Sequence, residues 1–235
     1  MARFSSRIVF SFLIAVLLYS THSTGQSDYY PLTEGARLFY QIRATQKAAA
    51  ESAQEQTLSA MIVHLGTAIV QGKSVVPEGR YIDGRLAGVT FIADDETGVY
   101  YFANQNGSSK KPVVMNPIQY LIKYPVQPGA TWQQKSSGFE MLIGKKLDVT
   151  LKASIVSEDE IVTVPAGVFA KCLKIHMTGA IHSFNGSAEY RIDNQLWYAP
   201  GLGMIKQIQK EERVSPKPVA FTMVLNLQEI KYDKF

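Results

Sequence analysis

Apolar and polar residues alternate along much of this chain, in short segments rich in β-branched and aromatic side chains. Such alternation gives a β-strand one apolar face and one polar face. Clusters of glycine, proline, asparagine and aspartate separate the segments, as expected for turns. The pattern predicts strands in residues 38–43, 58–70, 86–93, 99–102, 131–134, 139–143, 147–157, 160–164, 172–182, 187–198, 204–213 and 220–232. The chain is therefore predicted to form one all-β domain.

Two segments depart from the alternation. Residues 44–57 are rich in alanine and glutamine and have no apolar stripe, so they predict either a long mobile hairpin loop or a short exposed helix. In residues 116–122, Asn116 suits a helix N-cap and Pro117 the first helical position. Ile118, Leu121 and Ile122 would then share one face, which predicts one or two helical turns.

The stretch VTVPAGVFAKCLKIH, residues 162–176, predicts a β-hairpin. Residues 160–164 are expected to pair antiparallel with the strand that carries Cys172. The connection runs through Pro165–Phe169, where Pro165 restricts φ to roughly −65° and Gly167 supplies any positive φ.

Cys172 is the only cysteine of the chain, so an internal disulfide is excluded. It alternates with Leu173 and shares its predicted strand face with Lys174, which in principle lowers the pKa of a neighbouring thiol. No partner cysteine and no positioned base accompany it in the sequence. We expect a partly buried, chemically inert strand residue.

The first residues have the pattern of a secretory signal peptide. Arg3 and Arg7 precede an apolar run over residues 8–18, and the small residues Ser23 and Gly25 suit cleavage after Gly25. The alternative is an uncleaved N-terminal anchor. We expect residues 1–25 to be removed, residues 26–235 to form a single β-rich domain, and the product to reach the periplasm or the extracellular space. No later segment has the apolar length of a transmembrane helix.

Charge does not indicate a nucleic-acid partner. The chain has 24 basic and 20 acidic residues, and removal of the two arginines at positions 3 and 7 leaves 22 basic residues. No stripe of lysine and arginine of the kind that neutralises phosphates is present. The hydrophobic content of 46% is sufficient for an ordinary core.

Known catalytic signatures are absent from the sequence. It contains neither a G-x-S-x-G elbow nor a phosphate-binding P-loop, and the GLG at 201–203 is expected to be a turn. His176 and His182 would share a strand face, but a zinc site needs three or four ligands. The acidic groups at 94–96 and 158–160 are expected to be solvated turns. We therefore assign no catalytic residue, no cofactor and no metal.

Five stretches occur in a characteristic order: DYYPLTEGARLFYQI (28–42), DETGVYYFA (95–103), YPVQPGATW (124–132), VTVPAGVFAKCLKI (162–175) and LWYAPGLGMIK (196–206). This order resembles a loosely defined group of uncharacterised bacterial secreted proteins and lipoproteins. Their signature is a YFPL..G..W.Y start, a VTVPAGTF..C.KV centre and a WYA.GVGLVK close. Here Val168 stands where threonine is common, and the lipobox cysteine is missing, which implies a soluble exported protein.

The resemblance implies a single curved, mostly antiparallel sheet with little helix, similar to the half-barrels of periplasmic lipoprotein carriers. It implies no catalytic residues. Trp132 and Trp197 would then serve as core or rim packing, and stacking against a ligand is the alternative.

Three functions compete. The first is an exported binding protein that carries a hydrophobic or lipid-like ligand in a concave sheet face. The second is an envelope module that docks another protein, and the third is an enzyme of unrecognised type. The expected partner is thus a hydrophobic ligand or an envelope protein. Aromatic residues expected on the concave face are Tyr81, Phe91, Tyr100, Tyr101, Phe102, Trp132 and Trp197, of which Tyr81, Phe91, Tyr101, Trp132 and Trp197 are the candidate ligand contacts.

Overall fold

Thirteen antiparallel strands build a single sheet in the part of the chain that the structure describes. The structure is a computed structural model and describes residues 28–48, 52–106, 111–140, 146–183, 189–215 and 219–232. The strands are β1 Ala36–Ala48, β2 Gln54–His64, β3 Ala68–Val70, β4 Lys73–Ile82, β5 Arg85–Asp95, β6 Gly98–Asn106, β7 Val113–Lys123, β8 Thr131–Glu140, β9 Lys146–Val164, β10 Gly167–Ser183, β11 Glu189–Ala199, β12 Gly203–Ser215 and β13 Val219–Tyr232.

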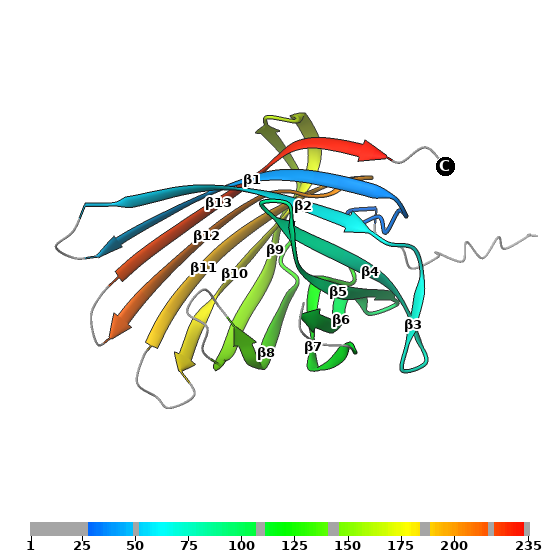
Figure 1. Cartoon of the computed structure of the whole chain (residues 1–235), viewed down its shortest axis with the longest axis horizontal. Coiled ribbons are helices and arrows are strands. Elements are labelled where there is room, and N and C mark those ends of the chain that lie inside the picture. Colours follow the sequence, from blue (N-terminus) through cyan, green and yellow to red (C-terminus); the bar gives the residue numbers. More distant parts are fainter. Residues whose placement is uncertain are drawn as a thin grey trace, which may run out of the picture.

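The sheet is a meander in which the first and last strands meet. Its order is β7-β6-β5-β4-β2-β1-β13-β12-β11-β10-β9-β8, with the short β3 beside β4. Strands β1 and β13 pair antiparallel in the middle, for example through Ile42 and Leu225. The end strands β7 and β8 follow each other in the chain and come into contact, so the sheet bends almost into a closed barrel (Figure 1). The all-β fold with one curved antiparallel sheet is confirmed.

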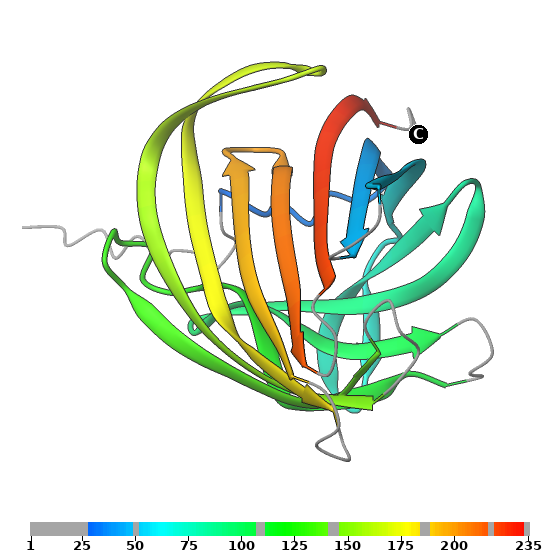
Figure 2. The ribbon, with the colours of Figure 1, turned by 90° about the vertical axis from the view of Figure 1, so that its left-hand side faces the viewer.

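The curvature is clearest along the strands. In Figure 2 the sheet passes from β9 and β10, in yellow-green and yellow, through β12 and β13, in orange and red, to β4 and β5, in teal. Strands of a twisted sheet that curls in this way present alternate residues to a concave and a convex side. No helix able to cross a membrane occurs among the residues that the structure describes.

The predicted helix at residues 116–122 is wrong, because these residues belong to β7. The ladder to β6 pairs Val114 with Ala103 and resumes at Gln119, so Pro117 lies where regular pairing is interrupted. A proline is tolerated there because β7 is an edge strand and needs fewer backbone donors. The apolar spacing at 118, 121 and 122 therefore arises in an irregular strand.

The expectation of a loop or helix over residues 44–57 is also wrong where these residues are described. Strand β1 extends to Ala48 and β2 begins at Gln54, and the two pair from Arg37–Val63 to Gln46–Gln54. This end of β2 is exposed on both faces, which explains the missing alternation. Backbone pairing between β1 and β13, on the other side of β1, stabilises this end of the β1–β2 hairpin. Residues 49–51 lie outside the described residues.

The predicted hairpin after residue 160 is confirmed. Val164 of β9 pairs with Gly167 of β10, and Pro165 and Ala166 form the turn. Gly167 has a φ of 146°, so the expected positive φ is also confirmed. The Ala166 amide donates a hydrogen bond of 3.2 Å to the carbonyl of Leu227, which ties the hairpin turn to β13.

Cys172 is completely buried, and so is its neighbour Leu173. Consecutive strand residues point to opposite faces, and Cys172 accordingly lies in one core cluster with Trp197 whereas Leu173 lies in another. Both faces of β10 are therefore covered here, beside a bulge where the β9–β10 register shifts between Phe169 and Cys172 and Lys171 has a positive φ of 55°. The Sγ atom of Cys172 donates to the Phe169 carbonyl at 3.4 Å, and burial raises the pKa of the thiol.

Candidate ligand-binding cavity

A cavity of about 310 Å³ lies on the inner side of the curved sheet. Its lining comes from strands in both halves of the sheet. About half of that lining is aliphatic or thioether side chains: Ile42, Ala60, Met61, Ile62, Ile82, Leu121, Leu151, Met177, Ile192, Leu196, Met204 and Leu225. Six tyrosines add to it, Tyr30, Tyr40, Tyr81, Tyr101, Tyr120 and Tyr198. The volume lies at the lower end of the range of about 300–1,000 Å³ for small-molecule sites.

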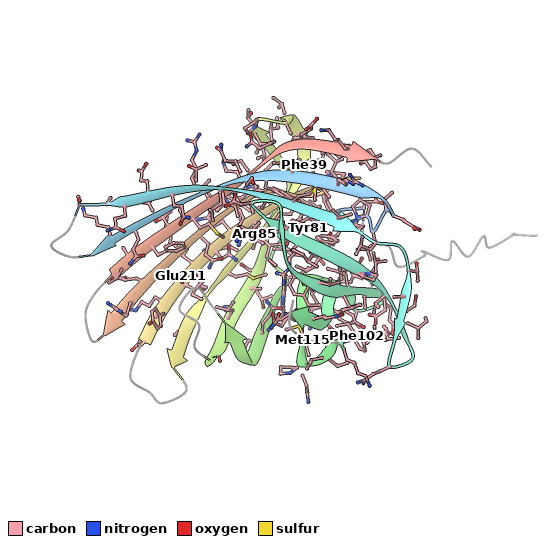
Figure 3. All side chains as sticks on the ribbon, in the orientation of Figure 1. Phe39, Tyr81, Arg85, Phe102, Met115 and Glu211 are labelled. Carbon is pink, nitrogen blue, oxygen red and sulfur yellow. The ribbon has the colours of Figure 1, made fainter. Side chains whose placement is uncertain are left out.

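Strand alternation explains how these side chains reach the cavity. On β11, residues 192, 194, 196 and 198 all line it, whereas the intervening Trp197 does not. On β4, Glu78, Arg80 and Ile82 line it in the same way. Tyr81 is also part of the lining, although its ring lies beside Gly79, the residue two before it on β4. Figure 3 shows Tyr81 and Arg85 near the β4–β5 turn, and Glu211 far along β12.

A buried polar cluster closes one part of the cavity wall. Tyr30 donates a hydrogen bond of 2.6 Å to Oε2 of Glu78, which is 1% exposed. His64 Nε2 lies 3.5 Å from the same oxygen. Burial and the Glu78 charge together raise the pKa of Tyr30 well above its usual value. The cluster gives the buried carboxylate two partners and holds the segment before β1 against the sheet.

Arg80 has no comparable partner. Its Nε is buried without a hydrogen bond, and none of the ion pairs between described residues involves it. The neighbouring Tyr101 is partly buried. Desolvation raises the pKa of its hydroxyl, the Glu78 charge acts in the same direction, and Arg80 opposes both. Arg80 therefore faces the cavity without a direct ion pair to any described residue, although Glu78 lies two residues away on the same face of β4.

Two further polar atoms in the lining lack a protein partner. The Oε1 atom of Gln134 and the hydroxyl of Tyr198 are buried and make no hydrogen bond. A buried polar group without a partner costs about 1–3 kcal/mol. The amides on β12 differ, because Gln207 donates to Asn194 and to Gln209 at 3.0 and 3.1 Å. Gln134 and Tyr198 thus offer hydrogen bonds that the protein itself does not use.

The candidate aromatic contacts separate into two groups. Tyr81 and Tyr101 line the cavity. Phe91, Trp132 and Trp197 lie in three different core clusters and are not part of the lining. Their exposed fractions are 7%, 5% and 7%, so these three rings are placed for packing.

Trp197 has its own environment outside the cavity. Its Nε1 donates a hydrogen bond of 2.7 Å to Glu160. The ammonium groups of Lys174 and Lys206 lie 4.9 and 5.2 Å from the centre of a Trp197 ring. These contacts stabilise the ring by cation–π attraction and leave it no free face toward a ligand.

Sequence reasoning did not single out Tyr30, Tyr40, Tyr198, Glu78 or Arg80, although all five line the cavity. One signal was present for the two charged residues. In VVPEGRYI, residues 75–82, Glu78 and Arg80 are two positions apart within an otherwise apolar strand. The spacing places Glu78 and Arg80 on the same strand face, but only the structure shows that this face is the concave one.

No group of three or more metal-ligating side chains occurs among the described residues. His176 instead lies 2.8 Å from Asp193 through Nε2 and Oδ2. Burial opposes ionisation of Asp193, yet the hydrogen bond from His176 holds the pKa of that carboxyl below its usual value. The side chain of His182 lies outside the described residues. Gly179 does not break the register between the two histidines, because it pairs regularly with Ile192 and Leu151.

Comparisons with known proteins give two similar folds. No protein-family model matches the chain, and no curated protein matches it. A crystallised candidate exported protein with a YmcC-like fold from Bacteroides fragilis is 15% identical, with a TM-score of 0.46 over 86% of this chain and 98% of that chain. A candidate lipoprotein from Parabacteroides distasonis is 16% identical, with a TM-score of 0.48 and the same coverage. These descriptions name neither a ligand nor an activity.

Proposed function

We propose that this chain is an exported, non-catalytic protein that binds a hydrophobic or lipid-like ligand inside its curved sheet. The observation that carries the proposal is the cavity of about 310 Å³ with a lining made mainly of aliphatic side chains and tyrosines. Except for Tyr30, every lining residue belongs to a hydrogen-bonded strand, so the cavity is largely preformed. A preformed apolar cavity with a few polar groups is the usual form of a small-molecule site.

The expected affinity follows from the apolar surface. Each buried methylene contributes about 0.8 kcal/mol, so roughly ten methylenes supply about 8 kcal/mol before the ordering of the ligand is counted. An affinity of about −8 kcal/mol corresponds to a dissociation constant of roughly one micromolar. A ligand with a single aliphatic chain is therefore expected to bind with a dissociation constant of about one micromolar or somewhat higher.

Titration with an environment-sensitive fluorescent fatty acid tests the proposal. We expect saturable binding at one site per chain. Ala60 lines the cavity, so Ala60→Phe should fill part of it and weaken binding at least about tenfold, equivalent to about 1.4 kcal/mol. Ala87→Phe is the matched control, because Ala87 is exposed on β5. Absence of binding by the wild type, or equal binding by Ala60→Phe when it melts like the wild type, contradicts the proposal.

An envelope interaction module is the second candidate, and exposed apolar residues on the β9–β10 hairpin favour it. Ile161 is 73% exposed and Val168 is 68% exposed. Val168 pairs with Thr163, two residues after Ile161, so both side chains lie on the same face. If the protein works by docking, substituting both by lysine should abolish its crosslinks to envelope proteins while leaving fatty-acid binding unchanged.

A further inference from the structure

We propose that the ligand is an amphiphile with one aliphatic chain and an anionic head group, and that Arg80 binds the anion. The inference rests on the proposed function and names its ligand class. Arg80 and Glu78 are the two charged residues in the described lining of the cavity. Their different partners decide which charge the ligand meets.

Glu78 is already compensated inside the protein. Tyr30 donates to it at 2.6 Å, and His64 approaches the same oxygen at 3.5 Å. One carboxylate oxygen of Glu78 therefore already has protein partners. Glu78 lines the cavity but is only 1% exposed, so it presents little surface to a ligand.

Arg80 is placed in the opposite way. The alternation of β4 turns its side chain to the concave side, and its pairing partner across the ladder is Ile62, which also lines the cavity. Its Nε is buried with no hydrogen bond from the described residues. The side chain as a whole is half-buried. A buried donor without an acceptor costs free energy, so the site favours a ligand oxyanion that accepts a hydrogen bond from Nε. Guanidinium–oxyanion hydrogen bonds are also among the stronger ones in proteins.

The rest of the lining suits an aliphatic tail. Met177, Ile192, Leu196 and Leu225 come from β10, β11 and β13, in the half of the sheet that does not contain β4. The unused hydroxyl of Tyr198 can donate a hydrogen bond to an oxygen of the ligand. The other strands also contribute the neutral amides Gln119, Gln134, Asn194, Gln207 and Gln209. A cation on β4 and a wall of aliphatic and uncharged polar side chains suit an amphiphile with one chain and an anionic head group.

A carboxylate and a phosphate monoester satisfy Arg80 equally well in this geometry. Both present oxygens that a guanidinium can bind through two parallel hydrogen bonds. Free fatty acids and single-chain lipid phosphates are therefore the two sources of the same chemistry. The experiment separates them by giving each its own probe.

Isothermal titration calorimetry with four probes of one chain length tests the inference: laurate, dodecyl phosphate, methyl laurate and dodecylamine, each below its micelle concentration. We expect the wild type to bind at least one of the anions about tenfold or more tighter than the neutral ester. Dodecylamine should bind more weakly than the ester. Tighter laurate binding identifies a carboxylate ligand, and tighter dodecyl phosphate binding identifies a phosphate.

Variants at Arg80 assign the preference to its side chain. Arg80→Met should bind laurate, dodecyl phosphate and methyl laurate with affinities within about twofold of one another, while its affinity for the ester stays near the wild-type value. Arg80→Lys should keep part of the preference, because it retains the charge and loses the paired donors. Arg85→Met is the matched control, since Arg85 is exposed at the start of β5, and it should keep the full preference.

Several results would overturn the inference. If the ester binds the wild type as tightly as both anions, the inference fails and the proposed function stands. If Arg85→Met loses the preference as fully as Arg80→Met, the effect is general electrostatics and Arg80 is not the contact. If no probe binds, the proposed function fails together with the inference. The wild-type comparison needs no variant, so the test holds even where a substitution prevents folding.

Discussion

Gly167 begins β10 with a φ of 146°, a backbone conformation that residues with a side chain rarely adopt. A Cβ added there would lie 3.8 Å from Cζ of Phe169, which is an ordinary contact, so space does not limit substitution. Backbone strain alone therefore sets the effect of Gly167→Val. Strain of this kind is worth about 1–3 kcal/mol.

The expected loss can be measured in two ways. For a domain of this size, a loss of about 1 kcal/mol lowers Tm by roughly 2–4 °C. Gly167→Val should therefore lower Tm by about 2–12 °C and lower the urea midpoint without changing the denaturant slope. An unchanged slope indicates that the native and unfolded states have kept their compactness.

Val168→Ala is the control for this substitution. Val168 is the next residue and is 68% exposed, so its change should stay within about 0.5 kcal/mol. If Gly167→Val unfolds like the wild type, the turn relaxes to a negative φ at no cost and the requirement for glycine is refuted. An equal loss in both variants would mean that the hairpin tolerates no change, whatever its φ.

The remaining predictions concern other parts of the chain. Cys172→Ala should lower the free energy of unfolding by about 1–2 kcal/mol through lost buried volume, and Cys172 should react with a thiol reagent only on unfolding. Gly179→Ala should destabilise by crowding, because its Cβ would lie too close to a backbone oxygen of β9; a normal urea midpoint would contradict this. Burial of the Asp95 carboxyl favours its neutral form, but hydrogen bonds from Lys73 and other donors outweigh this and hold the pKa of Asp95 well below its usual range. Its contribution, about 1 kcal/mol, is therefore present above the unfolded pKa near 4 and lost as pH falls through the folded pKa, so Asp95→Asn should flatten the acid side of the stability profile. Export should remove residues 1–25, and the intact mass of the protein from the exporting cell checks this; a full-length species in the membrane fraction would refute it.

Local patterning was enough to predict several elements. The alternation of apolar and polar residues predicted most of the strands, because a strand with one buried face leaves a period of two in the sequence. The hairpin before Cys172 was predictable for a similar reason, since the backbone limits of Pro165 and the freedom of Gly167 act within a few residues. For Cys172 the sequence predicted only partial burial, because its strand face also carries Lys174; its complete burial depends on side chains from other strands in its core cluster.

Patterning misled where pairing did not leave a period of two. Residues 116–122 resembled a helix start because an edge strand with interrupted pairing accepts a proline. Residues 44–48 and 54–57 have no apolar face, because they form the end of the β1–β2 hairpin, where β2 is exposed on both faces. In both places the neighbouring strand, which the local sequence does not contain, decides the conformation.

The cavity was decided by tertiary structure alone. Alternation divides each strand into two faces but does not say which face becomes concave, so Trp197 was a candidate on the same footing as Tyr81. Of these two aromatic residues, Tyr81 lines the cavity and Trp197 does not. Whether Arg80 meets a counter-charge depends on strands distant in sequence. The chain by itself thus determined an all-β fold and some of its turns, such as the one at Pro165 and Ala166, but not others: the acidic residues 158–160, expected in a turn, lie within β9. Closure of the sheet determined which side chains face the cavity, because inward direction is a property of the curved sheet and not of any single strand.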